Sequence, residues 1–242
     1  SHRGAGDIDI FLIDKDGNPA ADKGDQIARD ILKLEVTRIG KEHHSSFTFK
    51  GILVENHHEL RGKFLKTEAE NIFLEQLKQL ATNDIEVMRN VPGAFAPSVT
   101  FNAIFLMRHM IGNLHHGLLN LRQIVDWCYF LKVNGEKVDW TLVNSIQEEA
   151  GLSKFSADLN GFISTLCNFD IPKGVSATTD DNTIKNIMQE LLNPVKPGGN
   201  IVKRLTYYYR NRWATRYFFN KHWLVPLFSS IIKHLPFRLK NQ

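Results

Sequence analysis

A short segment near the start of the chain, Gly6-Asp7-Ile8-Asp9-Ile10, alternates carboxylates with isoleucines. Side chains on a β-strand point alternately to opposite faces, so Asp7 and Asp9 are predicted on one face and the two isoleucines in a core on the other. The two carboxylates would stand roughly 7 Å apart, a spacing that suits ligands of one or two divalent cations. Two solvated aspartates at a strand end would fit the same pattern.

The fold class follows from how apolar residues recur along the chain. Alternation or short apolar runs predict strands over residues 7–13, 46–49, 51–56 and 85–88, and helical spacing predicts helices over 20–34 and 65–80. From residue 98 onwards the spacing is helical only. We therefore predict an α+β protein, in which a small mixed sheet with helices in a domain of residues 1–97 is followed by an α-helical bundle domain of residues 98–242.

The composition is that of a globular protein, with 43% hydrophobic and 23% charged residues, and it excludes wholesale disorder. Cys128 and Cys167 lie in apolar segments without CxxC spacing, so we predict two buried thiols with no disulfide partner. No apolar run reaches the roughly 20 residues of a membrane-spanning helix, and the first residues do not resemble a signal peptide. These features predict a cytoplasmic protein.

The basic residues are concentrated at the end of the chain. Ten of the 30 lysines and arginines, and none of the 26 acidic residues, lie in residues 191–242, where they alternate with tyrosines, tryptophans and phenylalanines. Such a segment can bind an anionic membrane surface or a nucleic acid, or it can pack on an acidic body. For residues 201–219 we expect packing, and for residues 224–239 peripheral membrane attachment stays open.

A second acidic position supports a metal site. The apolar run Gly51-Ile52-Leu53-Val54 ends in Glu55, which Asn56 and His57 follow. If this strand lies beside the first one, Glu55 completes a cluster of three carboxylates, an arrangement suited to two-metal phosphoryl transfer with one carboxylate accepting a proton. An exposed strand end explains Glu55 about equally well on spacing alone.

The two segments together resemble the nucleotidyltransferase superfamily typified by DNA polymerase beta. Within it they are most similar to a group of uncharacterised bacterial nucleotidyltransferases with a helical C-terminal half. The resemblance rests on G-D-I-D-I, on a later strand ending V-E-N-H, and on L-R-x-x-x-D from Leu121 to Asp126. It extends from Arg3 to about Gly151.

The resemblance implies a nucleotidyltransferase-like sheet and a nucleoside triphosphate as substrate, with an undetermined acceptor. It also implies Mg²⁺ or Mn²⁺ bound by Asp7, Asp9 and Glu55, which would be the catalytic residues. Arg3, Gly6 and His57 are the residues that it implies for nucleotide binding.

The chain departs from the superfamily pattern at its start. The superfamily has a helix, a strand and a glycine-containing phosphate loop before the D-x-D strand, whereas only six residues precede Asp7. We interpret the chain as a fragment of a longer protein. The alternative is a degenerate, catalytically inactive member that binds nucleic acid or an anionic membrane through its basic segment.

Three histidines admit another interpretation. Arg108 and His115 have the R-x6-H spacing of a metal-independent ribonuclease motif, and His109 and His116 lie beside them. A two-residue motif arises often by chance. We therefore favour packing at a domain interface for these histidines.

Overall fold

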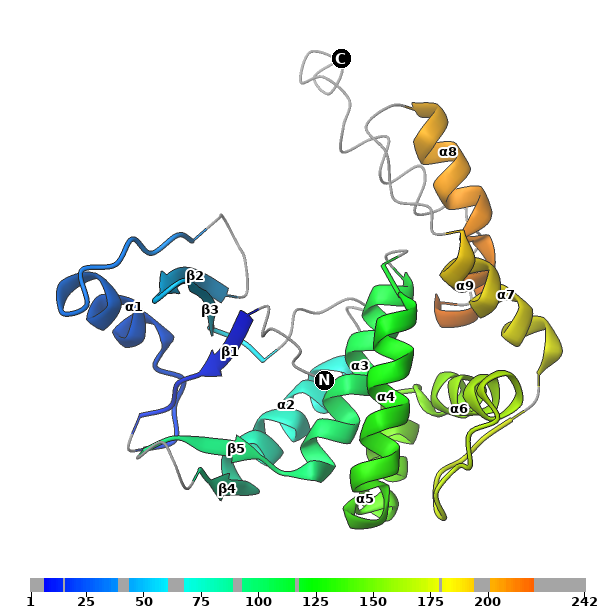
Figure 1. The fold of residues 1–242 in the computed structure, drawn as a ribbon, viewed down its shortest axis with the longest axis horizontal. Coiled ribbons are helices and arrows are strands. Elements are labelled where there is room, and N and C mark those ends of the chain that lie inside the picture. Colours follow the sequence, from blue (N-terminus) through cyan, green and yellow to red (C-terminus); the bar gives the residue numbers. More distant parts are fainter. Residues whose placement is uncertain are drawn as a thin grey trace. The chain divides into compact units, whose positions relative to one another are not determined.

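The computed structural model describes residues 7–14, 16–38, 44–60, 68–88, 93–115, 118–178, 180–193 and 201–219 (Figure 1). The fold is α+β, with small sheets at the beginning and helices after them. It forms two compact units, Ser1–Ala96 and Pro97–Gln242, which we call the α/β unit and the helical unit. The division of the chain into two folding domains stays a prediction.

The first sheet of the α/β unit is mixed. Its strands β1 (Asp7–Phe11), β2 (His44–Phe49) and β3 (Ile52–His57) lie in the order β1-β3-β2, with β1 parallel and β2 antiparallel to β3. The other elements are α1 (Ala21–Asp30), α2 (Glu68–Asn83) and a two-stranded pair of β4 (Ile85–Val87) with β5 (Phe95–Pro97). The central position of β3 places its residues between two neighbouring strands.

A two-residue turn sets the register between β2 and β3. Lys50 and Gly51 have positive φ angles of 50° and 79°, the backbone that tight hairpin turns require. The turn pairs Phe49 with Ile52 and, further along, His44 with His57. The turn therefore determines which residues of β2 lie beside the end of β3.

Helix α1 packs on one face of the sheet, against β3 (Figure 1). The side of α1 that carries Ala21, Asp25 and Ala28 is buried, and so is Val54 on β3. At Gly24 a Cβ atom would lie 2.3 Å from a methyl carbon of Leu12, so a larger residue there would require the Leu12 side chain to move.

The helical unit is built from the long helices α3 and α4 and the shorter helices that follow. Their bounds are α3 (Val99–His115), α4 (Leu121–Asn134), α5 (Trp140–Glu149), α6 (Ser153–Cys167), α7 (Asp181–Leu192), α8 (Ile201–Arg210) and α9 (Arg212–Phe219), with a 3-10 turn at Gly135–Lys137. Its core includes the fully buried Ile104, Trp127 and Phe155. Asn120 and Gln123 form a capping box on α4, and Asp139 caps α5, which explains where these helices begin.

The described part of the basic segment packs on the helical unit, as we expected. Tyr207 and Ala214 are buried, and α9 contacts α3. The Tyr217 hydroxyl donates a hydrogen bond to Asp158, a carboxylate that is only 1% exposed and also contacts Lys154. Residues 224–239, the predicted membrane-seeking segment, lie outside the described residues.

Two further sequence expectations concern the cysteines and the membrane. Cys128 is half-buried, but Cys167 is exposed, so the prediction that both thiols are buried is wrong. Cys167 is the last residue of α6, where the chain leaves the packed part of the helix. Among the helices that the structure describes, none has the length and apolar character needed to cross a membrane.

The bond between Tyr217 and Asp158 makes the docking of α9 testable. Burial, reinforced by this bond, raises the pKa of the Tyr217 hydroxyl well above its usual range, so it remains a donor at ordinary pH. We expect Tyr217→Phe to lower the free energy of unfolding by about 2 kcal/mol, because a buried carboxylate loses a partner. Urea unfolding measures the change, and Tyr129→Phe at an exposed tyrosine of α4 is the control. Equal stabilities of the two variants would contradict the prediction.

Candidate metal centre

The parallel pair of β1 and β3 carries the candidate site. In their register Asp9 pairs with Glu55, and Phe11 with His57. Residues paired across parallel strands share a face, and so do residues two apart along one strand. Asp9, Glu55 and His57 therefore lie on the same face of the sheet. Each offers one ligand atom to a group whose atoms all lie within 4.8 Å of one another.

His57 lies between the two carboxylates of this group. Its Nε2 atom is 2.7 Å from Oδ1 of Asp9 and 3.8 Å from Oε2 of Glu55. An ionised carboxylate can only accept a hydrogen bond, so in this contact Nε2 carries the hydrogen and donates the hydrogen bond to Asp9. The Nδ1 atom of His57 is buried without a hydrogen-bond partner among the described residues. The bond to Asp9 therefore orients the ring.

Burial and charge make the group favourable for a cation. The side chain of Asp9 is 64% exposed, against 24% for Glu55, so the group opens to solvent on the β1 side. The carboxylates of Asp9 and Glu55 have ligand atoms within 4.8 Å of each other. At that distance two negative charges repel each other by roughly 3 kcal/mol at an effective dielectric constant of about 20, before screening by solvent. Their hard oxygen ligands suit Mg²⁺ or Mn²⁺, which would offset this repulsion.

Asp7 stands apart from the group although it shares a face with Asp9. The residue opposite it on β3 is Leu53, because the D-x-D repeat advances two residues along the strand. Asp7 is exposed and is not among the atoms that lie within 4.8 Å of one another. Its role as a metal ligand stays a prediction.

The other predicted positions are only partly described. Arg3 and Gly6, expected to bind the nucleotide, lie outside the described residues, as do His116 and the side chain of His115. Arg108 is buried in α3, and the ring of His109 lies 6.4 Å from that of Phe105. The ribonuclease interpretation of Arg108 and His115 is therefore not tested.

One residue near the group was not predicted. His44 on β2 lies opposite His57, and its Nε2 atom is 3.7 Å from Oε1 of Glu55. Counting outward from the turn at Lys50 and Gly51 gives this pairing, so the hairpin was the signal that could have found it. The position of His44 adds a second imidazole beside the carboxylate of Glu55.

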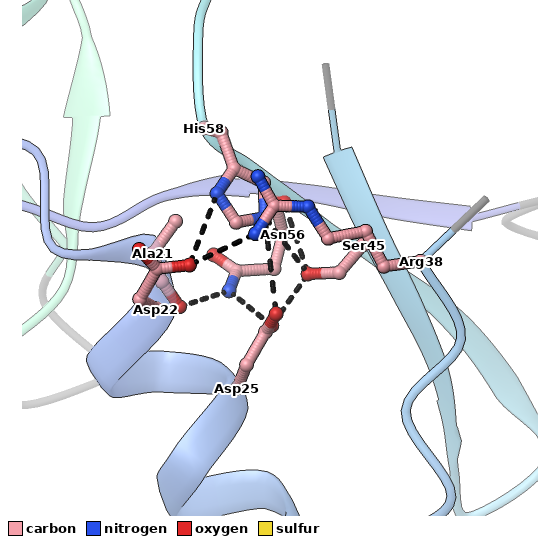
Figure 2. Close-up of polar contacts among 7 residues, drawn as sticks. All are labelled: Ala21, Asp22, Asp25, Arg38, Ser45, Asn56 and His58. Carbon is pink, nitrogen blue, oxygen red and sulfur yellow. Dashed lines mark hydrogen bonds and ion pairs between the residues drawn. The ribbon is translucent and has the colours of Figure 1, made fainter. Parts of the chain in front are cut away.

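A buried polar cluster holds β3 from the opposite face (Figure 2). Asn56, which lies between Glu55 and His57, is fully buried, and its Nδ2 atom donates to Asp25 at 2.8 Å and to the carbonyl of Ala21 at 2.9 Å. The Ser45 hydroxyl, also fully buried, donates to the same oxygen of Asp25. We call Asp25, Ser45 and Asn56 the α1 clamp, because it ties β2 and β3 to helix α1.

A second group with possible metal ligands adjoins the clamp. Asp22, Asp25 and His58 also bring ligand atoms within 4.8 Å of one another. However, Arg38 already contacts Asp22 at 3.0 Å, and the carboxylate of Asp25 accepts hydrogen bonds from the clamp (Figure 2). This group serves as a structural ion-pair and hydrogen-bond network.

Comparison with known proteins places these observations in a family. The model of a family described as uncharacterised nucleotidyltransferase matches residues 1–165, and the chain belongs to this family. No curated protein and no solved structure matches the chain. Membership supports nucleotidyltransferase activity in general and implies a nucleoside triphosphate as substrate, and the acidic and histidine group is compatible with the divalent metals that such enzymes typically use.

The clamp predicts a coupling between a buried amide and the metal centre. We expect Asn56→Ala to lower the free energy of unfolding by about 2 kcal/mol, because Asp25 and Ala21 each lose a donor. We also expect it to weaken Mn²⁺ binding about 10- to 100-fold, the usual cost of losing a residue that orients metal ligands. Urea unfolding and electron paramagnetic resonance titration with Mn²⁺ measure the two effects.

The matched control is Asn83→Ala, at an exposed asparagine at the end of α2. It should change neither quantity. If Asn56→Ala destabilises the chain but binds Mn²⁺ as tightly as the wild type, the clamp supports the fold without orienting the ligands.

Proposed function

We propose that this chain catalyses the metal-dependent transfer of a nucleoside monophosphate from a nucleoside triphosphate to a hydroxyl or phosphate acceptor. One observation carries the proposal. Asp9, Glu55 and His57 converge within 4.8 Å on two paired strands, and both strands lie inside the segment that the nucleotidyltransferase family model matches. Membership supports the reaction class, and the geometry supports Asp9, Glu55 and His57 as residues of the site.

Asp7, Asp9 and Glu55 are the proposed ligands of the cation. A bound Mg²⁺ or Mn²⁺ supplies positive charge for the triphosphate oxygens. His57 holds one oxygen of Asp9 through its Nε2–H. Arg3, Gly6 and His57 are proposed to contact the nucleotide.

Glu55 is the proposed general base. When the acceptor is a hydroxyl, its oxygen forms a bond to the α-phosphorus while the bond from that phosphorus to pyrophosphate breaks, and Glu55 takes the hydroxyl proton. The Glu55 side chain is 24% exposed, so an acceptor can reach it. The exposed side chain of Asp9 marks the side from which the substrates approach.

Binding of metal and nucleotide gives the first test. Mn²⁺ with a nucleoside triphosphate at about 100 times its dissociation constant should raise the melting temperature of the intact protein by roughly 5–10 °C, because the ligand binds only the folded state. Asp7→Asn combined with Asp9→Asn should abolish this rise. The ligand-free double variant should be as stable as the wild type or more so, since two like charges are removed.

Asp30→Asn, at an exposed carboxylate at the end of α1, is the control and should retain the full rise. A rise of equal size in the double variant would place the nucleotide at another site. No rise in the wild type would favour the inactive member over the enzyme.

The role of Glu55 gives a second test. We expect Glu55→Gln to lower transfer at least about 100-fold, because a general base contributes about 100- to 10,000-fold to rate. The measurement is incorporation of label from α-labelled nucleoside triphosphates into the acceptors of a cell extract. Glu86→Gln, at an exposed carboxylate of β4, should transfer like the wild type. Wild-type transfer by Glu55→Gln would remove Glu55 from the mechanism.

A further inference from the structure

The helical unit contains a cavity that is separate from the α/β unit and its metal centre. Its volume is about 260 Å³, and helices α3, α4, α5 and α6 line it together with residues Val175 and Ser176 of the loop after α6. The volume lies just below the range of about 300–1,000 Å³ that ligand pockets usually have. At roughly 30 Å³ for each water molecule, the cavity has room for about eight waters or for one small ring.

Hydrogen bonds made by its lining residues hold the walls of the cavity in place. The indole Nε1 atom of Trp127 donates to Asn160 at 3.0 Å, and the Asn160 amide donates to the carbonyl of Ser176 at 2.9 Å. Asn144 likewise donates to the carbonyl of Gly174 at 3.1 Å. These three polar side chains are therefore occupied in shaping the cavity.

Two buried polar side chains of the lining are not occupied in this way. Ser156 on α6 and Gln147 on α5 are each 5% exposed. Among the described residues, the Ser156 hydroxyl has no hydrogen-bond partner, and none is found for the Gln147 side chain. Buried polar groups are nearly always hydrogen-bonded, so a pair of such groups at one cavity indicates a ligand that supplies donors and acceptors.

The lining also defines the charge and shape of that ligand. Glu148, at the exposed rim, is the one charged residue of the lining, and no lysine, arginine or histidine belongs to it. A phosphate or carboxylate would thus find no positive charge there. Trp140, which is half-buried, supplies an apolar surface against which a flat ring face can pack.

We propose that the helical unit binds a neutral ligand of a single ring with several hydrogen-bonding groups, held by Ser156 and Gln147 against Trp140. A monosaccharide and a free nucleobase share this chemistry. The site is independent of the proposed nucleotidyl transfer, and its test does not require that activity.

The experiment uses the intact protein, with D-glucose and uracil as neutral probes and glucuronate and orotate as their carboxylated counterparts. Calorimetry and tryptophan emission should show saturable binding of one neutral probe with a dissociation constant of about 1 mM or tighter. Its carboxylated counterpart should bind at least about tenfold more weakly, because Glu148 repels it and no cation compensates. Binding of D-glucose would indicate a monosaccharide as the ligand, and binding of uracil a nucleobase.

A double variant separates binding from folding. Ser156→Ala combined with Gln147→Leu should weaken binding of the neutral probe at least about tenfold. The melting temperature of the ligand-free protein should stay equal or rise, since apolar groups replace unpaired polar ones. Ser145→Ala, at an exposed serine of α5, is the control and should bind like the wild type.

Three results would overturn the proposal. The first is no saturable binding of either neutral probe up to about 10 mM. The second is wild-type affinity in the double variant. The third is a lower melting temperature of the ligand-free double variant, which would show that the two side chains support the fold instead.

Discussion

The in-register parallel pairing of β1 with β3 is the constraint on which the metal centre depends. A slip by one residue would turn Glu55 to the face that packs on α1 and would separate it from Asp9. The α1 clamp opposes such a slip, because Asn56 can reach both Asp25 and the carbonyl of Ala21 only in the observed register. Gly24 of α1 also lies close to Asn56, since a Cβ atom there would be 3.1 Å from the Asn56 amide nitrogen. The geometry of the candidate site is therefore held by contacts on the face opposite to it.

Three consecutive residues of β3 show how the two faces of the sheet differ in role. Glu55 and His57 point to the face opposite α1, whereas Asn56 between them is fully buried on the α1 side. The repulsion between Glu55 and Asp9, on the order of 3 kcal/mol before screening, is unfavourable to folding. Buried hydrogen bonds to a charged group such as Asp25 contribute about 1.5–3 kcal/mol each and offset it. In this strand the residue between the candidate ligands Glu55 and His57 thus contributes stability that offsets the repulsion between Glu55 and Asp9.

The sequence allowed part of this arrangement to be predicted. Alternation along Asp7 to Ile10 predicted the first strand, and the apolar run before Glu55 predicted another, both as observed. That the two strands are neighbours was left open by the sequence and is observed in the structure. Which residues form the α1 clamp could not be predicted from the sequence. Asp25 looks like any solvated residue on the polar side of a helix, and its burial depends on a long-range contact with Ser45 that no local pattern encodes. The pairing of Asp7 with Leu53 likewise follows from register, which periodicity alone does not determine.

The end of the family match does not coincide with the end of a packed unit of the structure. The match ends at residue 165, inside α6, yet the buried Asp158 of that helix accepts a hydrogen bond from Tyr217 of α9. Ile187 of α7 is fully buried as well, so the later helices complete the same core. The cavity of the helical unit is closed in part by Val175 and Ser176, beyond the matched segment. The candidate metal centre therefore lies wholly within the family's common segment, whereas the second ligand site depends on residues outside it.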